Sequence, residues 1–97
     1  MNSDDLRIRA EKYVKLEEEA FLKISIAVPQ DSSLFNVAED FLRMARDYYS
    51  DAKSFMGKED FINCISAINY SYGWLDAGVR LGILSGSGDH RLFVHYR

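Results

Sequence analysis

The segment from Phe61 to Val79 constrains the fold more than any other, because its nineteen residues include one charged side chain, Asp76. Its apolar residues recur at steps of three and four, which is typical of an α-helix with a buried face. These residues are Phe61, Ile65, Ile68, Tyr72, Leu75 and Val79. A second stripe of apolar and small residues runs beside the first. The segment therefore predicts a central helix that neighbouring elements cover on two sides.

A long segment with so little charge could also cross a membrane, but polar residues inside it make that placement costly. They are Asn63, Ser66, Asn69, Ser71 and Asp76. The start of the chain is rich in charge and lacks the apolar core of a secretory signal. We therefore expect a cytoplasmic protein that has no membrane partner.

Length and charge limit the fold and the partners. A chain of 97 residues forms one domain, which buries roughly 60–65% of its unfolded surface. The net charge of −3 is spread along the chain and no segment forms a basic stripe, so we do not expect nucleic acid as a general partner. The single cysteine, Cys64, excludes an intramolecular disulfide and a zinc site built from several cysteines, and we expect it in the core.

Apolar residues at helical spacing predict two more helices before the central one. Pro29 ends the first, so we expect helices at about 3–28, 33–56 and 58–84. Helices of similar length joined by short links favour an all-α fold, a three-helix up-and-down antiparallel bundle over residues 1–84. An alternative keeps the second and third helices as a hairpin and swaps the first into a partner subunit.

The acidic run Glu17-Glu18-Glu19 raises the question of metal binding. Adjacent residues point in different directions on a helix, so the three carboxylates cannot converge on one ion. We expect a solvated face there, and we predict no metal site and no cofactor.

Residues 85–97 are expected to form a flexible or extended C-terminal tail. The link from Ser85 to Gly88 is typical of a flexible connection, and the residues after it alternate between apolar and polar, as in a strand. One strand needs a partner for its backbone groups. The tail is therefore expected to pair with a second copy, to lie along the bundle, or to become ordered only on binding. Its contact candidates are Arg91, Phe93, His95 and Tyr96.

Parts of the second half resemble a known family. The matching residues are the run Tyr48–Ala52, then Phe55 and Gly57, then the segment Trp74–Ile83, WLDAGVRLGI. They resemble the domain of unknown function 357 family, small archaeal proteins with no assigned activity. The resemblance covers about residues 35–84. It implies a three-helix up-and-down bundle and an archaeal, cytoplasmic origin, and it supplies no catalytic residues.

Asp76 stands alone in an otherwise uncharged helix, and a buried carboxylate needs a partner or a raised pKa. Arg80 lies four residues later, where the two side chains meet on one helix face. One interpretation is an ion pair that fixes the bundle. The other is a polar pocket formed by Asp51, Asp76, Arg80 and nearby tyrosines, in which two carboxylates perform acid–base work.

A dense aromatic set lies in the second and third helices: Tyr48, Tyr49, Tyr70, Tyr72 and Trp74. Tyr48 and Tyr72 fit the apolar stripes, whereas Tyr49 and Tyr70 lie off them. Aromatic side chains with one polar end are enriched at protein interfaces. We expect core packing for most of the set and a contact surface for the rest.

These patterns lead to three hypotheses. The first is a non-catalytic interaction module, a homo-oligomer or a binder of a protein partner, which uses the third-helix aromatics and the tail. The alternative is a small-ligand-binding protein or enzyme that uses the polar pocket. The third is nucleic-acid binding through Arg91, His95 and Arg97. No catalytic residue is identified, and the ligand or interaction candidates are Tyr49, Asp51, Tyr70, Trp74, Asp76 and Arg80.

Overall fold

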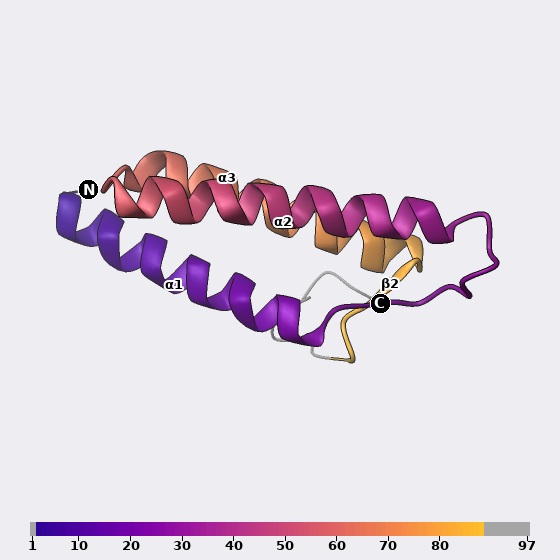
Figure 1. The fold of residues 1–97 in the computed structure, drawn as a ribbon. Helices are drawn as coiled ribbons and strands as arrows, with labels where there is room; N and C mark the ends of the chain where they lie inside the picture. The colour runs from indigo at the N-terminus through magenta and orange to yellow at the C-terminus, as the bar shows by residue number, and fades with distance from the viewer. Residues whose placement is uncertain (1, 89–97) are drawn as a thin grey trace.

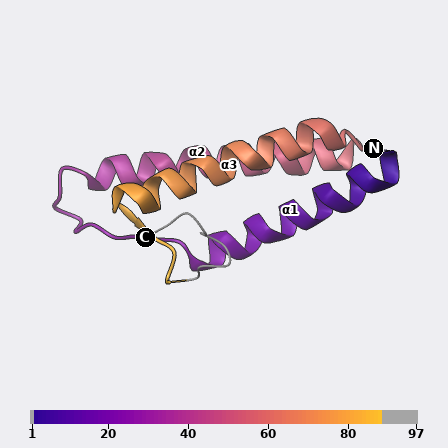
Figure 2. The same cartoon turned by 180° about the vertical axis from the view of Figure 1, so that it is seen from behind.

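The computed structural model describes residues 2–88 and confirms the all-α, three-helix up-and-down fold. The helices are α1 (Ser3–Lys23), α2 (Phe35–Gly57) and α3 (Phe61–Leu81). Figures 1 and 2 show α2 and α3 side by side along their length, with α1 on one side of the pair. The tight connection at residues 58–60 makes α2 and α3 an antiparallel hairpin.

Polar residues fix the starts of two helices. The side chain of Asn2 accepts a hydrogen bond from the Asp5 backbone N–H at 2.9 Å, and Asp60 accepts one from the Asn63 backbone N–H at 3.2 Å. Each bond satisfies a backbone donor that has no partner inside the helix. These caps set the first residues of α1 and α3.

The first helix ends at Lys23, five residues earlier than the sequence predicts. The chain is instead extended from Ile24, and Ser25–Ile26 forms the short strand β1. This strand pairs antiparallel with β2 (Leu84–Ser85), with Ser25 opposite Ser85. Pro29 disfavours a helical conformation at the residue before it, and β-branched residues favour an extended chain. The extended segment also packs its apolar side chains on the core: Ile24, Ile26 and Val28.

The third helix ends at Leu81, three residues before the predicted end. Gly82 has a φ of 84°, the left-handed conformation that commonly closes a helix and that glycine adopts without strain. The chain then turns back, and Ile83 and Leu84 are buried. The second helix begins at Phe35, two residues later than predicted.

The core consists of two apolar clusters along the bundle. One lies near β1 and β2 and the other near the start of α3. Several alanines are buried between the helices, which lets the helices approach one another closely. They are Ala10, Ala20, Ala38, Ala45 and Ala52. Within residues 2–88, no helix is both long enough and apolar enough to span a lipid bilayer.

Candidate functional site

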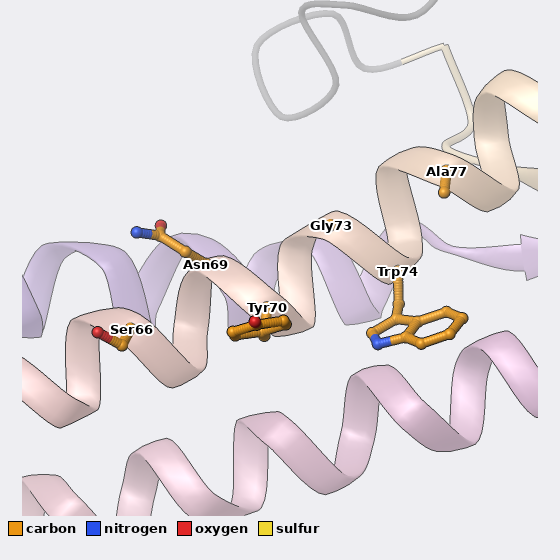
Figure 3. Close-up of a pocket in the computed structure, with 6 residues that line it drawn as sticks. All are labelled: Ser66, Asn69, Tyr70, Gly73, Trp74 and Ala77. Atoms are coloured by element: carbon orange, nitrogen blue, oxygen red, sulfur yellow. The ribbon is translucent and has the colours of Figure 1, made fainter.

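A shallow hollow of about 620 Å³ opens along α3. Its lining residues are Ser66, Asn69, Tyr70, Gly73, Trp74 and Ala77. In Figure 3, Tyr70 and Trp74 lie on the side of α3 that turns toward α2, and α1 passes behind α3. None of the six side chains carries a charge, so the hollow suits an apolar occupant.

Two aromatic residues that line the hollow pack against aromatic residues of α2. The ring of Tyr70 stacks on that of Tyr48, with centroids 5.0 Å apart, and Trp74 meets Phe41 edge to face at 5.1 Å. Both geometries are favourable for aromatic pairs. Tyr70 nevertheless remains 63% exposed. The sequence interpretation of Tyr70 as lying off the core stripes agrees with this exposure.

The hollow is part of a longer surface of α3, on which Arg80, near one end, is the one exposed charged side chain. We define the α3 face as the exposed residues Ile62, Ser66, Asn69, Tyr70, Gly73, Ala77 and Leu81. Large apolar side chains lie at its two ends, where Ile62 is 65% and Leu81 62% exposed. Its length is roughly 28 Å at 1.5 Å per residue.

The exposed surfaces of the other two helices differ from the α3 face in charge. On α1 they carry Arg7, Arg9, Glu11, Lys12, Lys15 and Glu18. On α2 they carry Glu39, Asp40, Arg43, Arg46, Asp47, Asp51 and Lys53. A helix face that stays in water normally carries such residues. The α3 face therefore differs in composition from the exposed surfaces of α1 and α2.

Asp76 and Arg80 form an ion pair within α3, with Arg80 Nε 3.1 Å from Asp76 Oδ2. The Asp76 side chain is 17% exposed, and its Oδ1 is buried with no hydrogen-bond partner in the described part of the chain. Burial, together with the charge of Asp76, raises the pKa of Tyr72. The pair is thus local to α3.

Asp51 lies on the exposed side of α2, three residues beyond Tyr48. Tyr48 lies opposite Tyr70 and Phe41 opposite Trp74, so the chain beyond Tyr48 runs toward the start of α3. Asp76 lies toward the other end. The described contacts do not bring Asp51 together with Asp76 and its arginine, so they give the small-ligand alternative no shared polar pocket.

Tyr49 belongs to the contact between α1 and α2. Its hydroxyl donates to Glu18 Oε2 at 2.6 Å, and its ring meets Phe21 edge to face. The hydrogen bond from Tyr49 lowers the pKa of Glu18, while burial raises the pKa of Tyr49. Tyr49 therefore faces α1 and does not contribute to the α3 face.

Glu17 is the polar residue that the sequence interpretation placed wrongly. It is 2% exposed, not solvated, and its Oε2 contacts Ser71 Oγ, which also lies 2.7 Å from the Ala45 carbonyl oxygen. A serine hydroxyl has one hydrogen and can donate to only one acceptor. If Glu17 is protonated, it donates to Ser71 and Ser71 donates to Ala45, so every group is satisfied.

Burial raises the pKa of Glu17 to about 7, and the hydrogen bond with Ser71 offsets part of that shift. The neutral carboxyl group then links α1 to α3, and Ser71 links α3 to α2. A signal for this burial exists in the sequence, because Glu17 continues the spacing of the buried residues Ala10 and Val14. A search for apolar residues alone passes over it, since a glutamate at that spacing does not extend an apolar stripe.

The contact candidates of the C-terminal tail lie outside the described residues. They are Arg91, Phe93, His95 and Tyr96. Within residues 2–88, no group of three histidine, cysteine or acidic side chains is arranged to hold a metal ion. Cys64 is buried, and burial raises the pKa of its thiol.

Comparison with protein families places the chain in a family. The family model described as "Protein of unknown function (DUF357)" matches residues 12–84, which is most of the chain and includes all of α2 and α3. Comparison with curated proteins and with solved structures gives no significant match.

Proposed function

The chain belongs to the DUF357 family, whose function is unknown, and we propose from its own surface that it is a non-catalytic self-association module. Its contact surface is the α3 face, which packs against a second copy of the chain. The observation that supports the proposal is the exposed face of neutral residues, with Arg80 near one end, on the helix that also forms the centre of the core.

Covering charged groups at an interface costs free energy, and the three helices differ in how many they expose. Contact through the exposed surfaces of α1 or α2 would remove many charged side chains from water, which costs free energy unless each finds a partner. Contact through the α3 face removes apolar and small side chains from water, which is favourable. Among the described surfaces, the α3 face therefore suits a partner that is itself uncharged.

A second copy supplies such a partner. The α3 face of another molecule has the same neutral composition, so pairing the two faces brings no like charges together despite the net charge of −3. The described part of the C-terminal segment, up to Gly88, lies beside the end of α1. Ser87 Oγ donates to the Lys23 carbonyl oxygen at 2.8 Å, at the end of α1. The chain thus leaves the described region beside α1.

The test compares masses in solution. Light scattering of the full chain, over a wide concentration range, is expected to approach twice the monomer mass of 11.2 kDa. Gly73→Arg is expected to give a monomer, because it places a charge in the middle of the α3 face. A Cβ at Gly73 meets nothing within 4 Å, so the fold itself tolerates the change.

The matched control is Ser50→Arg, which adds the same charge to the exposed surface of α2. It is expected to associate like the wild type, and circular dichroism checks that both variants are folded. A wild-type chain that remains monomeric at the highest concentrations overturns the proposal. So does a Gly73→Arg variant that associates as strongly as the control.

A further inference from the structure

The order of large and small residues along the α3 face has an internal symmetry. Large side chains occupy its ends, Ile62 and Leu81, and small ones lie inward at Ser66 and Ala77. At the centre, the exposed ring of Tyr70 stands three residues before Gly73, which has no side chain. The positions of each pair lie at equal distances from a point between Tyr70 and Gly73.

We propose that two copies pair through antiparallel α3 helices around a two-fold axis at this central point, with Tyr70 of each seated on the partner's Gly73. This inference rests on the proposed self-association and specifies its geometry. In the same register Ile62 lies opposite the partner's Leu81, and Ser66 opposite the partner's Ala77. The interface is isologous, since each contact occurs twice.

Packing selects this arrangement over the parallel one. A parallel two-fold pair would place Tyr70 against the partner's Tyr70 and glycine against glycine, which combines a steric conflict with a void. Both are unfavourable in close-packed interiors. The antiparallel register instead fills the hollow beside Gly73 with an aromatic ring. Small residues at Ser66 and Ala77 then let the two helix backbones approach closely.

The surroundings of the face agree with the same register. The residue that lies opposite Trp74 of one copy is the partner's Asn69, and both belong to the lining of the hollow. Arg80, the exposed charge at the end of the face, lies opposite the partner's Asn63, which is uncharged. No pair of like charges from the described residues of α3 meets across the axis.

Disulfide trapping tests the register in the full-length protein. The double variant Ser66→Cys/Ala77→Cys is expected to form a covalent dimer under mild oxidation, because each new cysteine lies opposite the other type in the partner. Each single variant is expected to stay uncrosslinked, since its two copies are about 11 residues apart along the paired helices, roughly 16 Å. A disulfide needs Cα atoms within about 7 Å.

Cys64 is buried, so oxidised wild-type protein provides the background. Strong crosslinking of either single variant overturns the antiparallel register, while leaving self-association in place. A dimer in light scattering whose double variant does not crosslink overturns the register in the same way. A monomer in light scattering removes both proposals, and the α3 face then has another occupant or none.

Exchange of large and small residues gives a second measurement. Tyr70→Ala leaves a void opposite Gly73, and Gly73→Tyr places two tyrosines against each other, so each is expected to weaken dimerisation by roughly tenfold or more. The combination Tyr70→Ala/Gly73→Tyr restores the pairing of large with small and is expected to recover most of the affinity. Losses that simply add in the double variant overturn the contact between these two positions.

Discussion

Glu17 of α1 contacts Ser71 of α3 in the middle of the bundle, although 54 residues separate them in the chain. Glu17 and Ser71 are among the few polar side chains buried in the described core. Ser71 also forms a hydrogen bond with the Ala45 carbonyl oxygen of α2. Glu17 is also one of only four buried residues of α1. The strength of this contact between α1 and α3 therefore varies with the protonation of one carboxyl group.

The first prediction concerns pH. The pKa of Glu17 is 4.5 in its ordinary state and about 7 in the folded protein. The folded state thus binds the proton more tightly, so this contribution to stability is fully present below pH 4.5 and is lost as pH rises through 7. The loss amounts to roughly 3 kcal/mol at about 1.4 kcal/mol per pKa unit. Urea unfolding between about pH 4 and about pH 8 measures it.

Glu17→Gln removes this particular pH dependence, because the amide donates a hydrogen bond to Ser71 but does not ionise. The difference in unfolding free energy between wild type and variant is therefore expected to change with pH. Glu11→Gln, at an exposed position of the same helix, is the control and follows the wild type. If the difference between the wild type and Glu17→Gln stays constant across the range, Glu17 is not neutral in the folded protein.

The second prediction concerns the approach of β2 to α3. A Cβ added at Gly78 would lie 2.4 Å from Leu84 Cδ1, and Leu84 is buried. Gly78→Ala is therefore expected to displace β2 and to lower the unfolding free energy by about 1–3 kcal/mol. Gly57→Ala is the control, because a Cβ there meets nothing within 4 Å. Equal stability of the two variants in urea would show that Leu84 moves aside freely.

The third prediction separates two ion pairs of the same type. Arg80→Ala leaves Asp76, 17% exposed, without its cation, whereas Arg43→Ala leaves Asp40, which is 50% exposed. Water replaces the lost partner of an exposed carboxylate but not of a mostly buried one. We expect a loss of about 1 kcal/mol for Arg80→Ala and under about 0.5 kcal/mol for Arg43→Ala. Similar losses for both, measured by chemical unfolding, would place Asp76 effectively in solvent.

Much of the fold follows from the sequence. Steps of three and four between apolar residues predict the three helices, and short links predict their antiparallel order, since both depend on neighbouring residues. Helix ends are less predictable. Lys23 ends α1 because the following residues pair with Leu84 and Ser85, in a segment distant along the chain.

Some features of the candidate site are likewise predictable from the sequence, and others are not. The low charge of the segment from Phe61 to Val79 is visible in the sequence, and Tyr70 lies off its apolar stripes. Which side of α3 faces water depends on where α1 and α2 pack, because two stripes fit a buried face. The grouping of Asp51 with Asp76 rests on residue type alone, and their positions along α2 and α3 do not support it.

The sequence by itself determined that this chain forms three helices, with a central one that carries little charge, because helical periodicity is a local property. Only the tertiary structure decided that Glu17 is buried and that Ile62 and Leu81 are not. The physical reason is that burial depends on the packing of helices distant in the chain. One buried charged residue, or one exposed apolar residue, leaves the periodic spacing of apolar residues in the sequence almost unchanged.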